Sequence, residues 1–76
     1  MDKMIRFKLR ELMAEKGFRE SRVITVAEIA NETGIHRATL SKIANERGYN
    51  TGTENIDRLC RYFNCDVADV MQRVPD

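Results

Sequence analysis

Apolar residues recur along this chain with the three- and four-residue spacing of helices that bury one side. The first such stripe consists of Ile5, Leu9, Leu12 and Met13. It predicts a helix that begins at Asp2 or Lys3 and runs to Lys16, where Gly17 ends it.

Residues 18–24 form the connection from this helix to the next. We expect the apolar side chains to fold back onto the core and the charged ones to stay in water. The apolar side chains are Phe18, Val23 and Ile24, and the charged ones are Arg19, Glu20 and Arg22. Nothing in this segment predicts a sheet.

The central stretch predicts two short helices joined by a tight turn. Thr25 and Glu28 have the spacing of a capping box, which marks the start of a helix. The inward face of that helix carries Ile29, Ala30 and Thr33, and we expect the helix to end near Thr33. The small Ala30 would let a second helix approach closely.

Gly34 stands where the chain must reverse, a position that favours a residue tolerating positive φ. Ile35 would turn back toward the core, and a second helix would begin around Arg37. Its inward side chains would be Leu40, Ile43 and Ala44. Two helices joined by a short turn with a glycine form a helix-turn-helix unit, here about residues 25–46.

The remaining third predicts a loop and two more helices. Residues 46–53 form the loop, and Tyr49 in it is either a core plug, which we favour, or an exposed ring. A fourth helix would be capped by Thr51 or Thr53. Its apolar stripe is Ile56, Leu59, Cys60 and Phe63. A short fifth helix capped by Asp66 would bury Val67, Val70 and Met71, with Val74 and Pro75 ending it.

Composition fits one soluble, cytoplasmic domain spanning residues 1–76, because no apolar run approaches the roughly 20 residues of a membrane span. The net charge of +1 is uninformative, but its distribution is not. Residues 1–22 carry seven Lys/Arg against four Asp/Glu, whereas residues 51–76 carry three against five. Such a polarised chain could meet an anion with its basic part.

The candidate chemistry is sparse. The basic cluster Lys3, Arg6, Lys8 and Arg10 is either a solvated helix face or a phosphate contact. Cys60 and Cys65 have no zinc-site spacing, and the one histidine, His36, lies in another element. We therefore predict no metal, no cofactor and no enzymatic activity.

The order Ala30, Gly34-Ile35, Leu40 and Ile43 resembles the helix-turn-helix of the Cro and phage-repressor-like DNA-binding proteins, the xenobiotic-response-element-type transcriptional regulators. Thr53 to Met71 is similar to the fourth and fifth helices of that domain. The resemblance implies an all-α, compact five-helix bundle of the lambda-repressor-like type. It also implies a small regulator that binds double-stranded DNA.

The outward face of the helix at 37–46 is the candidate DNA surface. Helical geometry points Ala38, Lys42 and Asn45 outward, flanked by Arg37 and Ser41. Arg37 suits a guanine edge, Ala38 a thymine methyl, and Lys42 a base edge or phosphate. Asn45 suits the phosphate backbone. The full predicted set is Thr25, Val26, Arg37, Ala38, Thr39, Ser41, Lys42, Asn45 and Arg47.

The resemblance places base reading on Arg37, Ala38 and Lys42, and backbone contact on Val26 and Asn45. The family often has glutamine where this chain has Val26, so a phosphate contact there would fall to a backbone N–H or to Thr25. His36 replaces a frequent serine and could cap the recognition helix.

Specific binding would need a homodimer on a two-fold symmetric site, formed through the fifth helix and its neighbouring loop. The alternative function is a protein-binding module, an antitoxin or adaptor that reuses the same fold.

Overall fold

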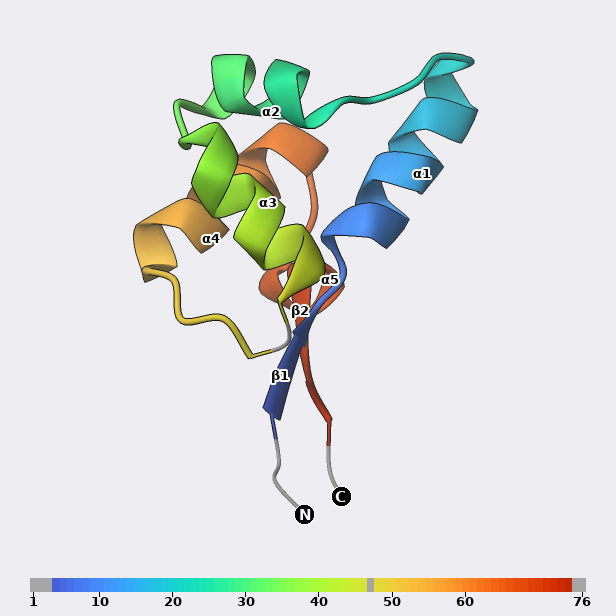
Figure 1. Cartoon of the computed structure of the whole chain (residues 1–76). Coiled ribbons are helices and arrows are strands. Elements are labelled where there is room, and N and C mark those ends of the chain that lie inside the picture. The colour runs from blue at the N-terminus through green and yellow to red at the C-terminus, as the bar shows by residue number, and fades with distance from the viewer. Residues whose placement is uncertain (1–3, 47, 75–76) are drawn as a thin grey trace.

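The computed structural model describes residues 4–46 and 48–74, and shows a helical body from which a two-stranded ribbon extends (Figure 1). The elements in chain order are β1 (Met4–Phe7), α1 (Leu9–Glu20), α2 (Val26–Thr33), α3 (Arg37–Asn45), α4 (Thr53–Phe63), α5 (Val67–Val70) and β2 (Met71–Val74). Within these residues, none of the helices has the length and apolar character needed to cross a bilayer.

The fold is mostly helical but not all-α, because the two chain ends pair as a sheet. β1 and β2 are antiparallel, with Met4 opposite Val74 and Phe7 opposite Met71. The predicted first helix from Asp2 or Lys3 is therefore wrong over its first turns, and Met71 and Val74 belong to a strand. Ile5 fits a strand as well as a helix, so pairing with the far end of the chain decides the conformation.

The first helix, α1, also ends later than predicted. Gly17 lies inside it, and Ser21 provides the left-handed residue at its end, with φ of 55°. The Arg22 N–H then donates to the Gly17 carbonyl over 3.0 Å, closing a Schellman-type turn. A Cβ at Gly17 would stand 2.6 Å from the Arg22 carbonyl oxygen, so the close return of the chain requires glycine here.

Only one of the three apolar side chains in the connection reaches the core. Ile24 is buried, whereas Phe18 and Val23 are 88% and 81% exposed, contrary to the prediction. Phe18 lies in the last turn of α1 on its exposed side, and Val23 lies in the exposed segment 21–23, before the chain returns to the core at Ile24.

Charged contacts hold the connection in place. Arg22 donates to both carboxylate oxygens of Glu28 over 2.6 and 2.8 Å, and the Tyr62 hydroxyl donates to Glu28 over 3.2 Å. The Lys16 ammonium lies 4.9 Å from the centre of the Tyr62 ring. Hydrogen bonds from Arg22 above all lower the pKa of Glu28. These contacts join the connection, through Arg22, to α2, α4 and α1.

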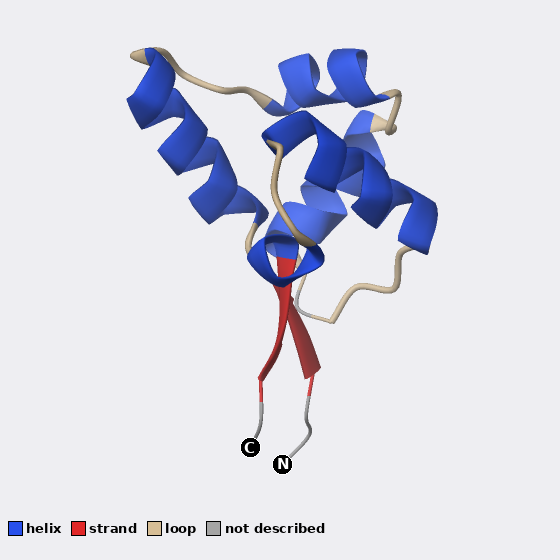
Figure 2. Cartoon of the chain, turned by 180° about the vertical axis from the view of Figure 1, so that it is seen from behind, coloured by secondary structure: helices blue, strands red, loops and turns tan. Residues whose placement is uncertain are grey.

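The helices, whose arrangement Figure 2 shows from behind, enclose one apolar core. Its buried members are Leu9, Ile24, Ile29, Ile35, Leu40, Ile43, Ile56, Leu59, Phe63 and Val70. Every helix and the turn contribute to it. Burial of this set is the main source of stability, because each side chain of this size contributes about 1.5–3 kcal/mol when fully buried.

The C-terminal part departs from prediction in its caps and in one apolar residue. Gly52, not a threonine, caps α4. Asp66 caps α5 as predicted, in a capping box completed by Asp69. Val67 is 55% exposed rather than buried, because a helix of four residues turns only one side to the core, and Val70 occupies it.

Candidate nucleic-acid interface

The start of α2 shows half of the predicted capping box. The Thr25 hydroxyl accepts from the Glu28 N–H over 3.1 Å, so Thr25 caps the helix as predicted. The Glu28 side chain bonds Arg22 and Tyr62 instead of reaching back. Thr25 is exposed and Val26 is half-buried, which leaves the Thr25 hydroxyl proton and the first backbone N–H groups as the polar groups of this helix end.

The turn between α2 and α3 has the geometry that its glycine predicts. Gly34 has φ of 78°, and its N–H donates to the Ala30 carbonyl over 2.9 Å. The Ile35 N–H donates to the Thr33 hydroxyl over 3.1 Å, and the Ile35 side chain is buried. Ala30 packs against the core beside it. These contacts fix the angle at which α3 leaves the turn.

His36 caps α3, as predicted. Its Nδ1 accepts from the Ala38 N–H over 3.1 Å. A ring nitrogen accepts only when it carries no proton, so the cap requires the neutral imidazole. Below the cap, Leu40 and Ile43 are buried and anchor the inner side of α3.

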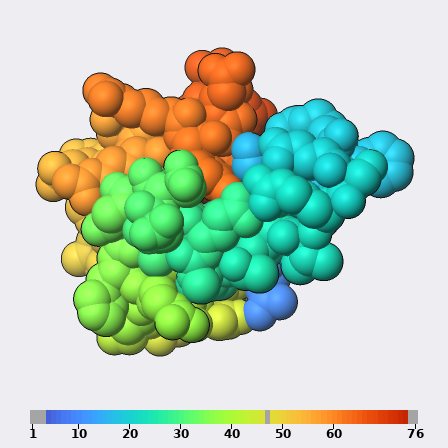
Figure 3. Space-filling model, turned by 90° about the horizontal axis from the view of Figure 1, so that it is seen from above, coloured from blue at the N-terminus to red at the C-terminus, as the bar shows by residue number. Residues whose placement is uncertain are grey.

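The outward face of α3 carries the predicted side chains. Arg37, Ala38, Ser41, Lys42 and Asn45 are exposed. Figure 3 shows the green segment, which contains α2 and the start of α3, as one continuous part of the surface. Thr39, by contrast, is half-buried, and Arg47 lies outside the described residues. The face combines long cations with short side chains, as suits insertion into a major groove.

Tyr49 connects the loop to this face in a way that the sequence did not reveal. Its ring is half-buried and packs against the core, so the predicted plug is present. The Lys42 ammonium lies 5.8 Å from the ring centre, at the outer limit of a cation–π contact. An aromatic seven residues after a lysine carries no periodic signal across a loop, so this contact could not be predicted.

The basic cluster near the N-terminus is largely engaged within the chain. Arg6 is paired with Glu11, and Arg10 bonds the end of α3. Lys8 is half-buried, and Lys3 lies outside the described residues. These contacts favour an internal role over a free phosphate-binding patch.

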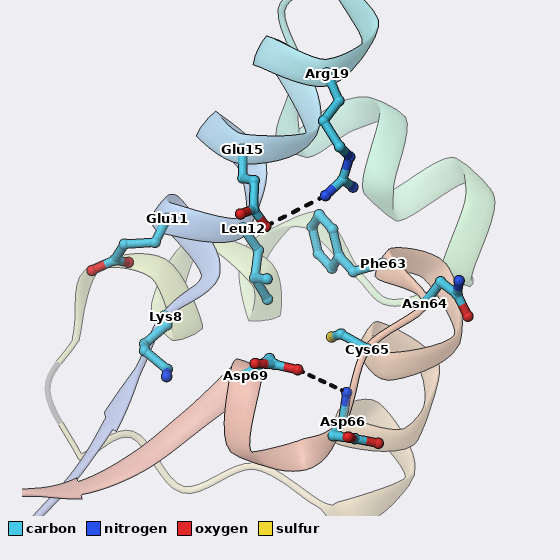
Figure 4. A pocket seen from close by; sticks show the side chains of 10 residues that line it. All are labelled: Lys8, Glu11, Leu12, Glu15, Arg19, Phe63, Asn64, Cys65, Asp66 and Asp69. Atoms are coloured by element: carbon cyan, nitrogen blue, oxygen red, sulfur yellow. Dashed lines mark hydrogen bonds and ion pairs between the residues drawn. The ribbon is translucent and has the colours of Figure 1, made fainter.

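The side of the molecule between α1 and α5 is unsuited to DNA. A cavity of about 550 Å³ there is lined by four carboxylates, from Glu11, Glu15, Asp66 and Asp69, against the cations Lys8 and Arg19 (Figure 4). Figure 4 also shows Cys65 beside this cavity, and burial raises the pKa of its thiol. No metal-ligand cluster of three or more His, Cys, Asp or Glu occurs among the residues that the structure describes.

Comparison with known proteins places the chain in a family. A family model of the Cro/C1-type HTH DNA-binding domain matches residues 8–76. Among solved structures, the fold is similar to "Crystal structure of transcriptional regulator VanUg, Form II", with a TM-score of 0.75 over 100% of this chain and 92% of that one, at 19% identity. Comparison with curated proteins finds no match. The chain therefore belongs to the family of Cro/C1-type helix-turn-helix DNA-binding domains.

Proposed function

We propose that this protein is a small transcriptional regulator, a repressor, that binds double-stranded DNA sequence-specifically by inserting α3 into the major groove. The observation that carries the proposal is the outward face of α3. Its cations and short side chains are exposed, while Leu40, Ile43 and Ile35 hold the opposite side in the core. The protein in the solved structure of similar fold is named a transcriptional regulator, which is consistent with this function.

Each exposed residue has a role that its chemistry suits. Arg37, at the start of α3, reads a guanine edge, because its planar fork matches two acceptors. Ala38 contacts a thymine methyl, and Ser41, with the half-buried Thr39, lies against the DNA phosphate backbone. Lys42 binds a base edge or phosphate from one turn further along.

The experiment is selection of bound duplexes from a randomised pool, followed by anisotropy titration of the best sequence across a salt series. A specific site bound at least about 10³-fold more tightly than random DNA supports the proposal. Arg37→Ala should then cost about 1–3 kcal/mol and relax one base position. Glu32→Ala, on the exposed side of α2, is the matched control. Weak binding with no enriched sequence and no response to Arg37→Ala would overturn the proposal.

A single recognition helix reads few base pairs, so we infer a homodimer on a two-fold symmetric site. The exposed Val67 of α5 lies beside a largely apolar hollow of about 580 Å³, whose lining includes Ile5, Tyr49 and Met71. This supports pairing through α5 and the neighbouring loop. Sedimentation equilibrium should show dimers that Val67→Asp dissociates, and a monomer at tens of micromolar would contradict the inference.

The exposed pair Phe18 and Val23 favours a second candidate function, a protein-binding module such as an antitoxin or adaptor. Large apolar side chains at such exposure are suited to a protein partner. Capture of one stoichiometric partner that Phe18→Ser and Val23→Ser abolish would support this function. Retention of the partner by both variants would exclude Phe18 and Val23 as its binding surface.

A further inference from the structure

The C-terminal end of the recognition helix is held by a side chain from α1. The Nε of Arg10 donates to the Ala44 carbonyl over 3.2 Å, and a second guanidinium nitrogen donates to Oδ1 of Asn45. The contact joins residues 34 and 35 positions apart in the chain. It is a direct polar connection from α1 to the helix proposed to read DNA.

Asn45 uses both ends of its amide in this arrangement. Its Oδ1 accepts from Arg10, and its Nδ2 donates to the Ser41 carbonyl one turn back, over 2.8 Å. The sequence predicts that Asn45 contacts the phosphate backbone of DNA. In the structure its amide closes the last turn of α3 and is oriented by the guanidinium, so at most one of its N–H groups is left for DNA.

The physical need for such a contact follows from the helix end itself. The last carbonyls of a helix lack intrahelical partners, and a cation beside them interacts favourably with the helix dipole. In α3 the Glu46 N–H satisfies the Lys42 carbonyl, and Arg10 satisfies that of Ala44. Arginine presents donors in a planar fork and can meet two acceptors at once, which a lysine ammonium does less well.

We propose that Arg10 is a positioning residue for DNA recognition, which fixes Asn45 and the last turn of α3 without itself contacting DNA. The proposal rests on the proposed function. Lys42 lies in the last turn of α3, which Arg10 holds in place. If this turn were less ordered, the Lys42 ammonium would be less well positioned for its base edge or phosphate. The competing interpretation is that Arg10 binds a phosphate directly.

The first arm of the test needs no DNA. Backbone amide hydrogen exchange is followed by NMR in the wild type, Arg10→Ala and Arg10→Lys. We expect the Glu46 N–H, which closes the last turn, to exchange faster in both variants. The Gly34 N–H in the turn before α3 should be unchanged. Exchange at Glu46 unaffected by either variant would overturn the proposal.

The second arm measures affinity for the selected duplex. Arg10→Ala should weaken binding about tenfold, the size expected for losing a hydrogen bond to a charged group. Arg10→Lys should not restore it, since the charge without the fork is insufficient. The slope of affinity against salt should stay that of the wild type. Arg19→Ala and Arg19→Lys, on the same helix but paired with Glu15, are the matched controls.

A double-mutant cycle with Asn45→Ala completes the test. Asn45→Ala removes one of the two acceptors of Arg10 and leaves the Ala44 carbonyl, so Arg10→Ala should cost less in the Asn45→Ala background than in the wild type. Rescue by lysine, together with a salt slope reduced by about 0.9 in Arg10→Ala, would overturn the proposal in favour of a direct phosphate contact. A wild type with no sequence preference would instead refute the proposed function, while the exchange arm still tests the contact.

Discussion

The helix-turn-helix unit and the paired chain ends are built on different kinds of information. The boundaries of α2, the turn and the start of α3 are set by residues within a few positions, because Thr25, Gly34 and His36 all bond or bend the backbone locally. In the ribbon, Met4 is opposite Val74, and neither strand is defined without the other. The difference shows that the helix-turn-helix unit, as far as the start of α3, is specified locally, whereas the ribbon forms only in the completed fold.

The largest expected effect comes from the same substitution made in both regions. Ile43→Ala should lower the free energy of unfolding by about 2–5 kcal/mol, because Ile43 is buried in the core. Ile5→Ala should lower it by only about 1 kcal/mol, since the Ile5 side chain in the ribbon is half-buried. Urea denaturation followed by circular dichroism measures both values. Equal losses would mean that the ribbon is part of the same cooperative core.

The next effect concerns the turn. Gly34→Ala should destabilise the protein by about 1 kcal/mol, because alanine is strained at φ of 78°. An added Cβ would meet no atom closer than 3.6 Å, so crowding adds nothing. Gly34→Asn is the control in thermal denaturation and should cost less, because asparagine adopts the left-handed conformation more readily than alanine. A Gly34→Ala protein as stable as the wild type would contradict the local account of the turn.

A smaller effect is expected from pH, acting on the carboxylate that ties the unit to its surroundings. The pKa of Glu28 is lower in the folded protein, chiefly through its bonds from Arg22. The stability that this provides is therefore present above the unfolded pKa of about 4.3, and is lost as pH falls through the lower folded value.

The denaturation midpoint should accordingly fall with pH below about 4.3, and should fall less in Glu28→Gln. Glu32→Gln, on the same helix, is the control and should retain the wild-type profile. A Glu28→Gln profile that matches the wild type would show that the Arg22 contact contributes nothing measurable.

The smallest effect is expected just outside the unit. Val23→Ser and Phe18→Ser should change stability by no more than about 0.5 kcal/mol, because both side chains are exposed. Ile24→Ser, one position further along and buried, should be clearly destabilising. Thermal denaturation of the three variants locates the border of the core between residues 23 and 24. A large loss of stability in Val23→Ser would show that the core extends to residue 23.

Prediction from the sequence succeeded where the deciding residues are neighbours in the chain. The bounds of α2 and α3, the cap by His36 and the exposure of Arg37 and Lys42 all follow from local rules. DNA contact by these residues stays a prediction. The family assignment is confirmed by the match over residues 8–76.

Prediction failed where distant residues decide. The apolar spacing of Ile5 and Leu9 fits a helix, and only the partner strand near residue 74 makes β1 extended. The bond from Arg10 to Asn45 and the contact of Lys42 with Tyr49 depend on which elements meet, so no local pattern announces them. Hydrophobicity alone predicts Phe18 in the core, but Phe18 lies in the last turn of α1 on the side that faces away from the core.

The pairing of Met4 with Val74 makes this chain suited to circular permutation. A short linker between the two ends, with new termini opened in the loop between Asn50 and Thr51, would leave the Gly52 cap attached to α4. It would convert the ribbon from the most distant pairing in the chain into a hairpin. Loop closure for that pairing would then cost far less entropy, so the ribbon would move from a late to an early step in folding. The face of α3 would be unchanged, which would separate the speed of folding from the ability to bind DNA.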